Sequence, residues 1–126
     1  QYLDSAGLKV TYVLWHQGES NHVLYSGGLS AEENAMVYTL NFHTLVSYLR
    51  SRGIDAPIYP AVATYCIREP DTVLQNAQRL LANDSLGIGS GPDTDRLGKE
   101  YRYDNCHFNE AGLDRHAELW REVLMR

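Results

Sequence analysis

The sequence predicts an α/β fold with a parallel sheet, and three observations lead to this prediction. Short runs of β-branched and aromatic residues at 9–15 and 57–65 are typical of buried strands. The longer segments that separate and follow them place apolar residues at helical spacing. Strands that alternate with helices form parallel sheets with right-handed crossovers. The 126 residues suffice for one domain with a core and are too few for two, so we expect residues 1–126 to form a single domain.

The first half of the chain is predicted to form one strand, one loop and one long helix. The strand covers Lys9–Trp15, and the polar loop that follows it covers His16–Leu29. Ser30 and Glu33 have the spacing of a capping box, which predicts the start of a helix that continues to about Arg52. Apolar residues at helical spacing are expected to face the core from this helix: Met36, Leu40, Leu45, Val46 and Leu49.

The second half predicts two further strands and two further helices. Pro57–Tyr65 is the second strand, in which Pro60 favours a bulge or an edge position. A helix capped by Asp71 is expected over Asp71–Ala82, a short third strand over Leu86–Ser90, and a last helix after its cap at Asn109. The residues expected to face the core from these two helices are Val73, Leu74, Ala77, Leu80, Leu81, Leu113, Ala117, Trp120, Val123 and Leu124.

Composition and charge limit the classes of partner. Hydrophobic residues make up 44% and charged residues 21%, which is ordinary usage for a globular protein and argues against disorder. The formal net charge is -5 and the chain has no basic run, so we expect neither a nucleic-acid partner nor an anionic membrane surface. No apolar stretch approaches the ~18 residues that a membrane span needs.

The start of the chain and its cysteines say little about the cellular compartment. The chain begins at Gln1 without Met and shows no signal peptide, so we expect its natural N-terminus to lie upstream. The compartment stays unassigned, with a periplasmic or secreted location favoured. We favour two free, partly buried thiols at Cys66 and Cys106, with a single bridge as the alternative if the protein is secreted. If the two strands are parallel neighbours, the Cα atoms of these cysteines should lie within roughly 10 Å.

Two polar clusters carry the chemistry that the sequence suggests. Gln17, Gly18, Glu19 and Asn21 directly follow the first strand. In open α/β sheets the functional site lies just beyond the carboxyl ends of the strands, which is where this first cluster falls. The second cluster is Asp104–His107, ahead of the last helix. We expect the two clusters to form part of one hydrolase active site.

The strings Trp-His-Gln-Gly-Glu-Ser-Asn at 15–21 and Asp-x-x-His-Phe at 104–108 resemble two sequence blocks of SGNH hydrolases of the sialate O-acetylesterase type, which are also grouped as carbohydrate esterases. The resemblance extends over nearly the whole chain and implies a three-layer α/β/α flavodoxin-like fold with a parallel sheet. In that family the nucleophilic serine lies in a block after the first strand, which would precede Gln1. The chain would then be the C-terminal part of a catalytic domain, and we expect it to pair with the missing N-terminal segment or with itself.

His107 is the natural general base in such a site, because imidazole titrates near neutral pH. Asp104, three residues earlier, can reach the His107 ring and fix its tautomer. The alternative is a structural role, in which His107 lies at the start of a helix and hydrogen-bonds only backbone groups. The presence of the Gln-Gly-Glu block in the same chain favours the catalytic role.

Donors for the oxyanion are expected from the first cluster. Gln17 carries an NH₂ group, and Gly18 permits close approach of the backbone. By the resemblance, Gln17 takes the position that an asparagine fills in other SGNH enzymes. Asn21 is the rival donor, and ordinary turn chemistry is an equal explanation for it. Glu19 cannot donate when ionised, so we expect it to orient the loop by accepting backbone N–H groups.

Three other readings of the same residues are less favoured. Ser20, Asp104 and His107 follow the chain order of an α/β-hydrolase triad, but a nucleophile elbow needs a helix that starts at the serine and a glycine where His22 stands. Cys106 cannot easily serve as nucleophile for an adjacent histidine ring. A metal site is not favoured, because no metal-binding motif is present among the candidates Asp93, Asp95, Asp104 and His107. We expect only surface positions or satisfied polar contacts for His16, His22, His43 and His116.

The sequence therefore leaves two functions from different classes. The first is a serine esterase that removes O-acetyl groups from a carbohydrate, needs no cofactor, and takes its serine from upstream. The second is a non-catalytic α/β module that binds a carbohydrate or a protein partner. Sialic acid, xylan and other acetylated glycans are all compatible with the first.

Overall fold

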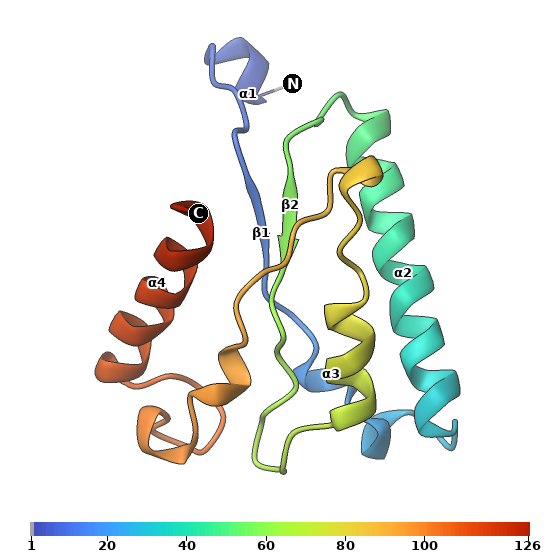
Figure 1. Cartoon of the computed structure of the whole chain (residues 1–126), viewed down its shortest axis with the longest axis vertical. Helices are drawn as coiled ribbons and strands as arrows, with labels where there is room; N and C mark the ends of the chain where they lie inside the picture. The colour runs from blue at the N-terminus through green and yellow to red at the C-terminus, as the bar shows by residue number, and fades with distance from the viewer. Residues whose placement is uncertain (1) are drawn as a thin grey trace.

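The structure is a computed structural model that describes residues 2–126; Gln1, the first residue of the predicted domain, lies outside the described residues. Its sheet has two parallel strands, β1 (Val13–Trp15) and β2 (Ile58–Pro60), joined in the register Val13 with Ile58 and Trp15 with Pro60. Figure 1 shows the two strands side by side at the centre of the molecule. The predicted α/β class with parallel pairing is confirmed.

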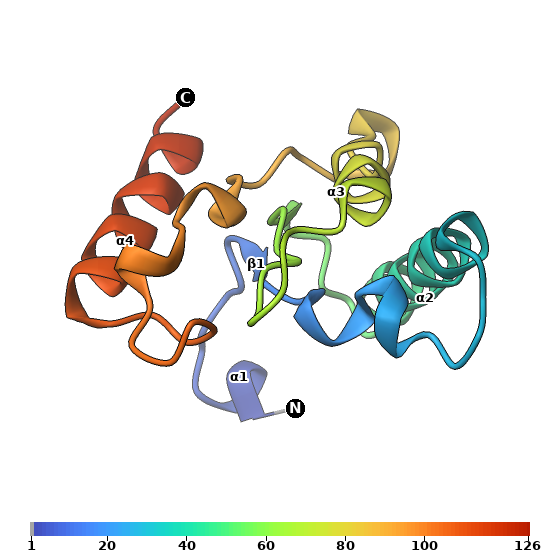
Figure 2. The same ribbon diagram turned by 90° about the horizontal axis from the view of Figure 1, so that it is seen from below.

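The described residues form four α-helices, which lie on both sides of this sheet. Figure 2 shows α2 and α3 on one side of the strands and α4 on the other. Five short 3₁₀ helices occupy the loops at 19–21, 23–25, 84–86, 94–96 and 99–101. The α-helices are α1 (Tyr2–Ser5), α2 (Ala31–Ser51), α3 (Thr72–Arg79) and α4 (Glu110–Leu124).

Each long helix begins where its capping residue predicts. Ser30 accepts a hydrogen bond from the backbone N–H of Glu33 and the Glu33 side chain accepts one from the backbone of Ser30, so the capping box of α2 is complete. Asp71 caps α3 and Asn109 caps α4. The predicted end of α3 at Ala82 is wrong, since regular helix stops at Arg79.

The predicted third strand over 86–90 is wrong as a regular element. Ile88 forms only an isolated parallel bridge with Ile58, through bonds of 3.0 Å from Ile58 N to Gly87 O and 2.9 Å from Gly89 N to Ile58 O. The ladder does not continue as a regular strand because Pro60 has no N–H to donate to this segment, although Gly91 N still donates to Pro60 O at 3.1 Å. Pro60 ends β2, which is an edge strand of the two-stranded sheet, in agreement with one of the two positions that its proline favoured.

The core lies between the sheet and the helix pair α2 and α3. Its buried residues are Tyr38, Phe42, Val46, Ile58, Leu74, Leu81 and Ile88. Val13, Trp15 and Leu49 pack against this cluster. The face of α2 that meets the sheet therefore repeats every four residues from Tyr38, and two predicted core residues, Met36 and Leu40, lie on the opposite, exposed face. Three further predicted core residues are also exposed: Leu80, Leu113 and Ala117.

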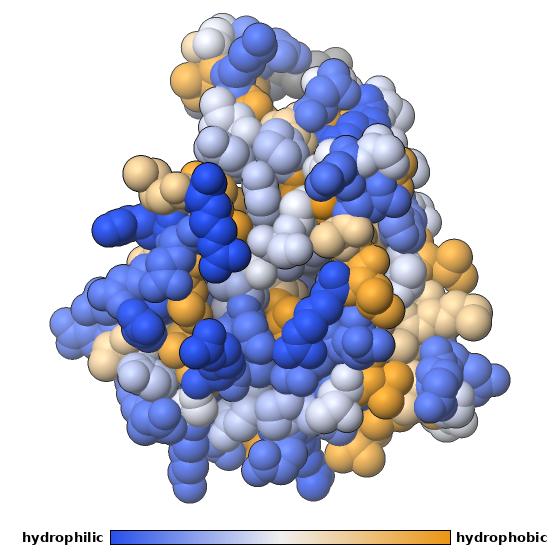
Figure 3. Space-filling model, in the orientation of Figure 1, coloured by the Kyte–Doolittle hydropathy of each residue, from blue (hydrophilic) through white to orange (hydrophobic). Residues whose placement is uncertain are grey.

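Apolar atoms are exposed along the α2 side of the molecule in Figure 3. Met36, Val37 and Leu40 of that helix are all exposed. Within residues 2–126, no helix combines the length and the apolar character that crossing a membrane requires.

Candidate active site

The loops after β1 and β2 are fastened together at the carboxyl ends of the two strands. A Cβ atom placed on Gly18 would lie 2.1 Å from the carbonyl oxygen of Ala63, so this contact requires glycine. The buried Gln78 side chain of α3 accepts from Ala63 N at 3.0 Å and donates to Gln17 O at 3.3 Å. Tyr38 of α2 donates to the same Gln17 carbonyl at 2.9 Å. The predicted close backbone approach at Gly18 is therefore present.

Asp104 and His107 form the hydrogen-bonded pair that their spacing predicts. Asp104 Oδ2 lies 2.6 Å from His107 Nδ1, and Asp104 Oδ1 accepts the backbone N–H groups of His107 at 2.6 Å and Cys106 at 2.9 Å. The bond from the His107 ring, followed by the bond from its backbone N–H, lowers the pKa of Asp104 to about 2. The His107 ring stacks on Tyr103 with centroids 5.9 Å apart and is largely exposed, with 69% of the side chain accessible. The predicted hydrogen bond is confirmed, and the catalytic role stays a prediction.

The buried Arg102 side chain packs against the loop that carries Asp104 and His107 and bonds its backbone. Arg102 donates from Nε to Leu97 O at 3.0 Å and from Nη1 to Cys106 O. Its guanidinium carbon lies 4.6 Å from the centre of the Tyr65 ring and 4.5 Å from that of Phe108. Burial lowers the pKa of Arg102, an effect that nearby carboxylates oppose. Its side chain therefore fixes the backbone that carries His107.

Cys66 and Cys106 are joined by a disulfide, so the expectation of two free thiols is wrong. Their Cα atoms are 4.1 Å apart, which confirms the predicted proximity at the carboxyl ends of the strands. Next to the bridge, Ile67 N donates to Asn105 O at 2.8 Å. The Cys spacing alone contains no sign of this pairing, because the bridge depends on two loops that meet only in the folded chain.

The turn after Cys66 is strained. Ile67 has a φ of 64°, a conformation that is unfavourable for a β-branched residue. Arg68 N donates to Cys66 O at 2.6 Å, which closes a γ-turn around Ile67. Asn105 on the facing loop has the same φ, which asparagine tolerates better. The disulfide and the bonds between the two loops hold this conformation in place.

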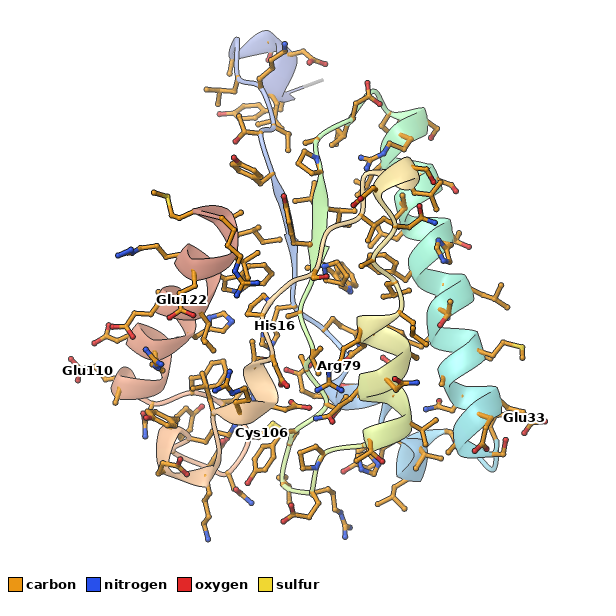
Figure 4. The ribbon with its side chains drawn as sticks, in the orientation of Figure 1. His16, Glu33, Arg79, Cys106, Glu110 and Glu122 are labelled. Atoms are coloured by element: carbon orange, nitrogen blue, oxygen red, sulfur yellow. A yellow bond between two sulfur atoms is a disulfide. The ribbon has the colours of Figure 1, made fainter. Side chains whose placement is uncertain are left out.

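A cleft of about 860 Å³ lies over these loops and reaches from His16 after β1 to Leu113 of α4. It is lined by His16, Glu19, Ser20, Tyr25, Cys66, Arg102, Cys106, His107, Phe108 and Leu113. The structure thus brings Glu19 of the first predicted cluster and His107 of the second to one cavity. Figure 4 shows His16 between the strands and α4, with Cys106 in the loop nearer the bottom of the view.

The other two side chains of the first cluster lie elsewhere. Gln17 and Asn21 line a separate hollow of about 240 Å³ beside α2, together with Tyr38 and Phe42. Gln17 Nε2 donates to Asn21 Oδ1 at 2.5 Å, so one N–H of the Gln17 amide is held by Asn21. Successive side chains of an extended chain point to opposite faces, and His16 takes the α4 side while Gln17 takes the α2 side. The expected oxyanion role of Gln17, Gly18 and Asn21 stays a prediction.

His16 and His116, for which the sequence predicted only surface positions or satisfied polar contacts, form a chain of polar contacts beside the cleft. His16 Nε2 lies 2.9 Å from Glu19 Oε1, and His16 Nδ1 lies 3.1 Å from His116 Nε2 on α4. Trp120 Nε1 donates to that same His116 nitrogen at 3.1 Å. Besides the backbone N–H groups that we expected it to accept, the Glu19 carboxylate therefore contacts a side chain, the ring of His16. The sequence holds one signal for this arrangement, since His116 and Trp120 are four residues apart on one helix face.

Burial and neighbouring charge set the protonation of this chain. Burial pushes the pKa of Glu19 upward, but the bond and charge of His16 and the backbone N–H groups of Glu19 and Gly18 outweigh it, so the pKa falls below its usual value. Burial, then the charges of His16 and Arg102, lowers the pKa of His116 to about 4. At neutral pH, Glu19 is ionised and His116 is neutral.

The remaining candidates have structural partners. Ser20 lines the cleft, yet within residues 2–126 it makes no hydrogen bond to His107. His22 is buried and contacts Leu24 N and Glu69 O, in agreement with a satisfied polar residue. Asp95 accepts four hydrogen bonds from Thr64, Tyr65 and Gln75. In the described part of the chain, no three His, Cys, Asp or Glu side chains are grouped as metal ligands.

A scan against protein-family models, a search of curated proteins and a search of solved structures each found no match to this chain.

Proposed function

We propose that this chain is the C-terminal part of an SGNH-type serine esterase that removes O-acetyl groups from carbohydrates. The proposal rests on one observation. The His107–Asp104 pair, with Nδ1 and Oδ2 2.6 Å apart, stands at the edge of a cleft that the polar loop after β1 also lines. Because Nδ1 is occupied by Asp104, the His107 Nε2 atom is available to exchange a proton with a nucleophile.

The chemistry assigned to these residues is acyl transfer in two steps. A serine hydroxyl attacks the ester carbonyl carbon while His107 Nε2 takes the hydroxyl proton, and Asp104 stabilises the imidazolium that forms. The bond to the sugar oxygen then breaks, and His107 returns the proton to that oxygen. In the second step water, activated by the same histidine, attacks the acetyl-serine ester and releases acetate and the free serine. For Gln17 and the backbone of Gly18 to act as the proposed oxyanion donors, both must turn toward the cleft, because the Gln17 amide lies in the hollow beside α2 and the Gly18 N–H bonds the Glu19 carboxylate.

We also propose that the parent fold is a three-layer flavodoxin-like sandwich and that the serine comes from a segment upstream of residue 1. β1 pairs with β2 along one edge only, and Leu14 in its middle is 45% exposed. An edge with unpaired backbone groups and an exposed apolar residue suits a further parallel strand. That strand would end beside the loop that carries Gln17.

The test is serine labelling of the chain expressed with the residues that precede it in its reading frame. A fluorophosphonate should label one upstream serine, and p-nitrophenyl acetate and O-acetylated glycans should be hydrolysed. His107→Ala should lower kcat at least ~100-fold, as expected for loss of a general base, while His43→Ala on α2 serves as the matched control. Residues 1–126 alone should not exceed the background of free histidine. Labelling of Ser20, or neither label nor hydrolysis, would refute the proposal.

A binding module without catalysis is the second candidate. The cleft contains the rings of Tyr25 and Phe108 and the side chain of Leu113, and Tyr25 is 54% exposed. Aromatic faces of this kind can pack against a sugar ring. Saturable binding of a glycan by the extended chain, with no hydrolysis and no reactive serine, would support this candidate over the esterase.

A further inference from the structure

Asn105 stands in the middle of the turn that carries Asp104 and His107, and its side chain is held by the loop after β2. Tyr65 Oη donates to Asn105 Oδ1 at 2.6 Å, and Asn105 Nδ2 donates to Ile67 O at 3.4 Å. A reversed amide would place its oxygen against the Ile67 carbonyl oxygen, so these two contacts define how the Asn105 side chain is oriented. The backbone adds a third contact, since Ile67 N donates to Asn105 O at 2.8 Å.

The backbone conformation of Asn105 allows its two neighbours to meet. Its φ of 64° lies in the left-handed region, which asparagine enters at lower cost than most residues. The chain reverses at this point, and Asp104 Oδ1 accepts the backbone N–H groups of Cys106 and His107 while Oδ2 lies 2.6 Å from His107 Nδ1. A turn that left this conformation would separate the carboxylate from the imidazole ring.

Tyr65 can hold the turn because the rest of the residue is fixed. Its backbone N–H donates to the buried Asp95 at 2.9 Å, and the Arg102 guanidinium carbon lies 4.6 Å from the centre of its ring. Its hydroxyl group is the atom that bonds the turn. The disulfide from Cys66 to Cys106 ties the same two loops together, but a covalent link alone still permits rotation about its bonds. Contacts beside the disulfide are needed to fix the direction in which the turn faces.

We propose that Tyr65 and Asn105 are positioning residues of the esterase: the Tyr65 hydroxyl holds the Asn105 amide and thereby keeps His107 Nε2 directed at the nucleophile. The effect on catalysis rests on the proposed function, whereas the effect on the turn does not. The Asp-x-x-His pattern leaves position 105 open, so the contact with Tyr65 alone assigns this role. Neither residue is among the described residues that line the cleft, so both act through the turn and not on the ligand.

Loss of the Tyr65 hydroxyl should change kcat more than KM. A shift of about 1 Å in a reacting group costs on the order of 100-fold in rate. One hydrogen bond among several permits a smaller shift, so we expect kcat of Tyr65→Phe to fall roughly tenfold. KM should change little, because neither Tyr65 nor Asn105 touches the cleft in which the ligand would lie.

The hold on the turn is tested by NMR of residues 1–126, where no activity is needed. The unaltered chain should show nuclear Overhauser effects between the Tyr65 ring and the Asn105 side-chain amide. Tyr65→Phe removes only the hydroxyl and should speed hydrogen exchange of the His107 amide, which donates to Asp104 Oδ1, roughly two- to tenfold. Tyr12→Phe, on the segment before β1, is the matched control and should not. Absence of the Overhauser effects, or unchanged exchange in Tyr65→Phe, overturns the inference.

The positioning role is tested in the extended, active protein by a double-mutant cycle. Tyr65→Phe should lower kcat on p-nitrophenyl acetate roughly tenfold at nearly constant KM, and Asn105→Gly, which keeps the left-handed turn and loses the same bond, at least as much. The double variant should be no slower than Asn105→Gly alone, because within residues 2–126 the Tyr65 hydroxyl bonds no other group. Tyr12→Phe should keep the full kcat.

Two results would defeat the positioning role while leaving the proposed function intact. One is full kcat in Tyr65→Phe, and the other is a double variant whose loss is the product of the two single losses. If Tyr65→Phe does not fold, hydrogen exchange and kcat of Asn105→Gly decide in its place. Absence of hydrolysis in the unaltered protein would defeat the proposed function, while the exchange data would still decide whether Tyr65 holds the turn.

Discussion

Removal of the Cys66–Cys106 disulfide should cost this domain a large part of its stability. The bridge closes a loop across a sequence separation of 40 residues. In the chain-entropy model, a loop of that length corresponds to about 4 kcal/mol of free energy of unfolding at 25 °C. For a chain of 126 residues, whose unfolding entropy is roughly 2 cal/mol/K per residue, this equals a fall in Tm of about 15 °C.

The assay is urea unfolding of the double variant Cys66→Ala/Cys106→Ala beside the unaltered chain, each with and without a dithiol reductant. Reductant should destabilise the unaltered chain to the level of the variant and should not change the variant. Hydrogen exchange at the His107 amide, which donates to Asp104 Oδ1, should become faster in the variant because its loop loses the tether. A stability difference below about 1 kcal/mol would show that the folded loops, and not the bridge, restrict the chain.

Three further predictions follow from burial, close contact and backbone strain. The pKa of His116 is lowered to about 4 in the folded chain. Between pH ~6.5 and ~4, His116 is therefore protonated in the unfolded chain and neutral in the folded chain. The free energy of unfolding should therefore decrease by ~2 kcal/mol as the pH is lowered from ~6.5 to ~4, after allowance for the half-exposed ring. In melts measured across this pH range, a His116→Gln variant should lose this dependence. Gly18→Ala should cost about 1–3 kcal/mol, the range for overpacking, in urea unfolding, because its Cβ would lie 2.1 Å from Ala63 O. Gly7→Ala, which has open space around it and shares only the cost of a positive φ, should cost less, and equal losses would contradict the contact. Ile67→Asn should raise the free energy of unfolding by about 1 kcal/mol, because asparagine tolerates the φ of 64° and the isoleucine is 63% exposed; a loss of stability would argue against strain.

The starts of the long helices and the pairing of Asp104 with His107 could be predicted because they depend on neighbours in sequence. A capping residue bonds a backbone N–H two or three positions away, as Ser30 and Asn109 do. Asp104 and His107 are three residues apart on one turn, so their contact needs no distant partner. The parallel pairing of β1 with β2 was predictable as well, since a helix that connects two strands imposes it.

Other features were decided by which loops meet in three dimensions. The disulfide joins the loop after β2 to the loop that precedes α4, and the His16–His116 contact joins a strand end to the last helix. Neither depends on local spacing, so neither leaves a pattern in the sequence. The core face of α2 was also set by the sheet, which selects Tyr38 and leaves the equally periodic Met36 exposed.

The sequence by itself predicted the local turns and the short-range pairing of the residues to which a chemistry is proposed, because capping, short-range hydrogen bonds and strand–helix alternation act between near neighbours. Only the tertiary structure decided how those residues are divided between two cavities. The direction in which the chain leaves β1 sends Glu19 to the cleft with His107 and Gln17 to the hollow beside α2. That direction is fixed by the contact of Gly18 with Ala63 and Gln78, two residues that only folding brings to it.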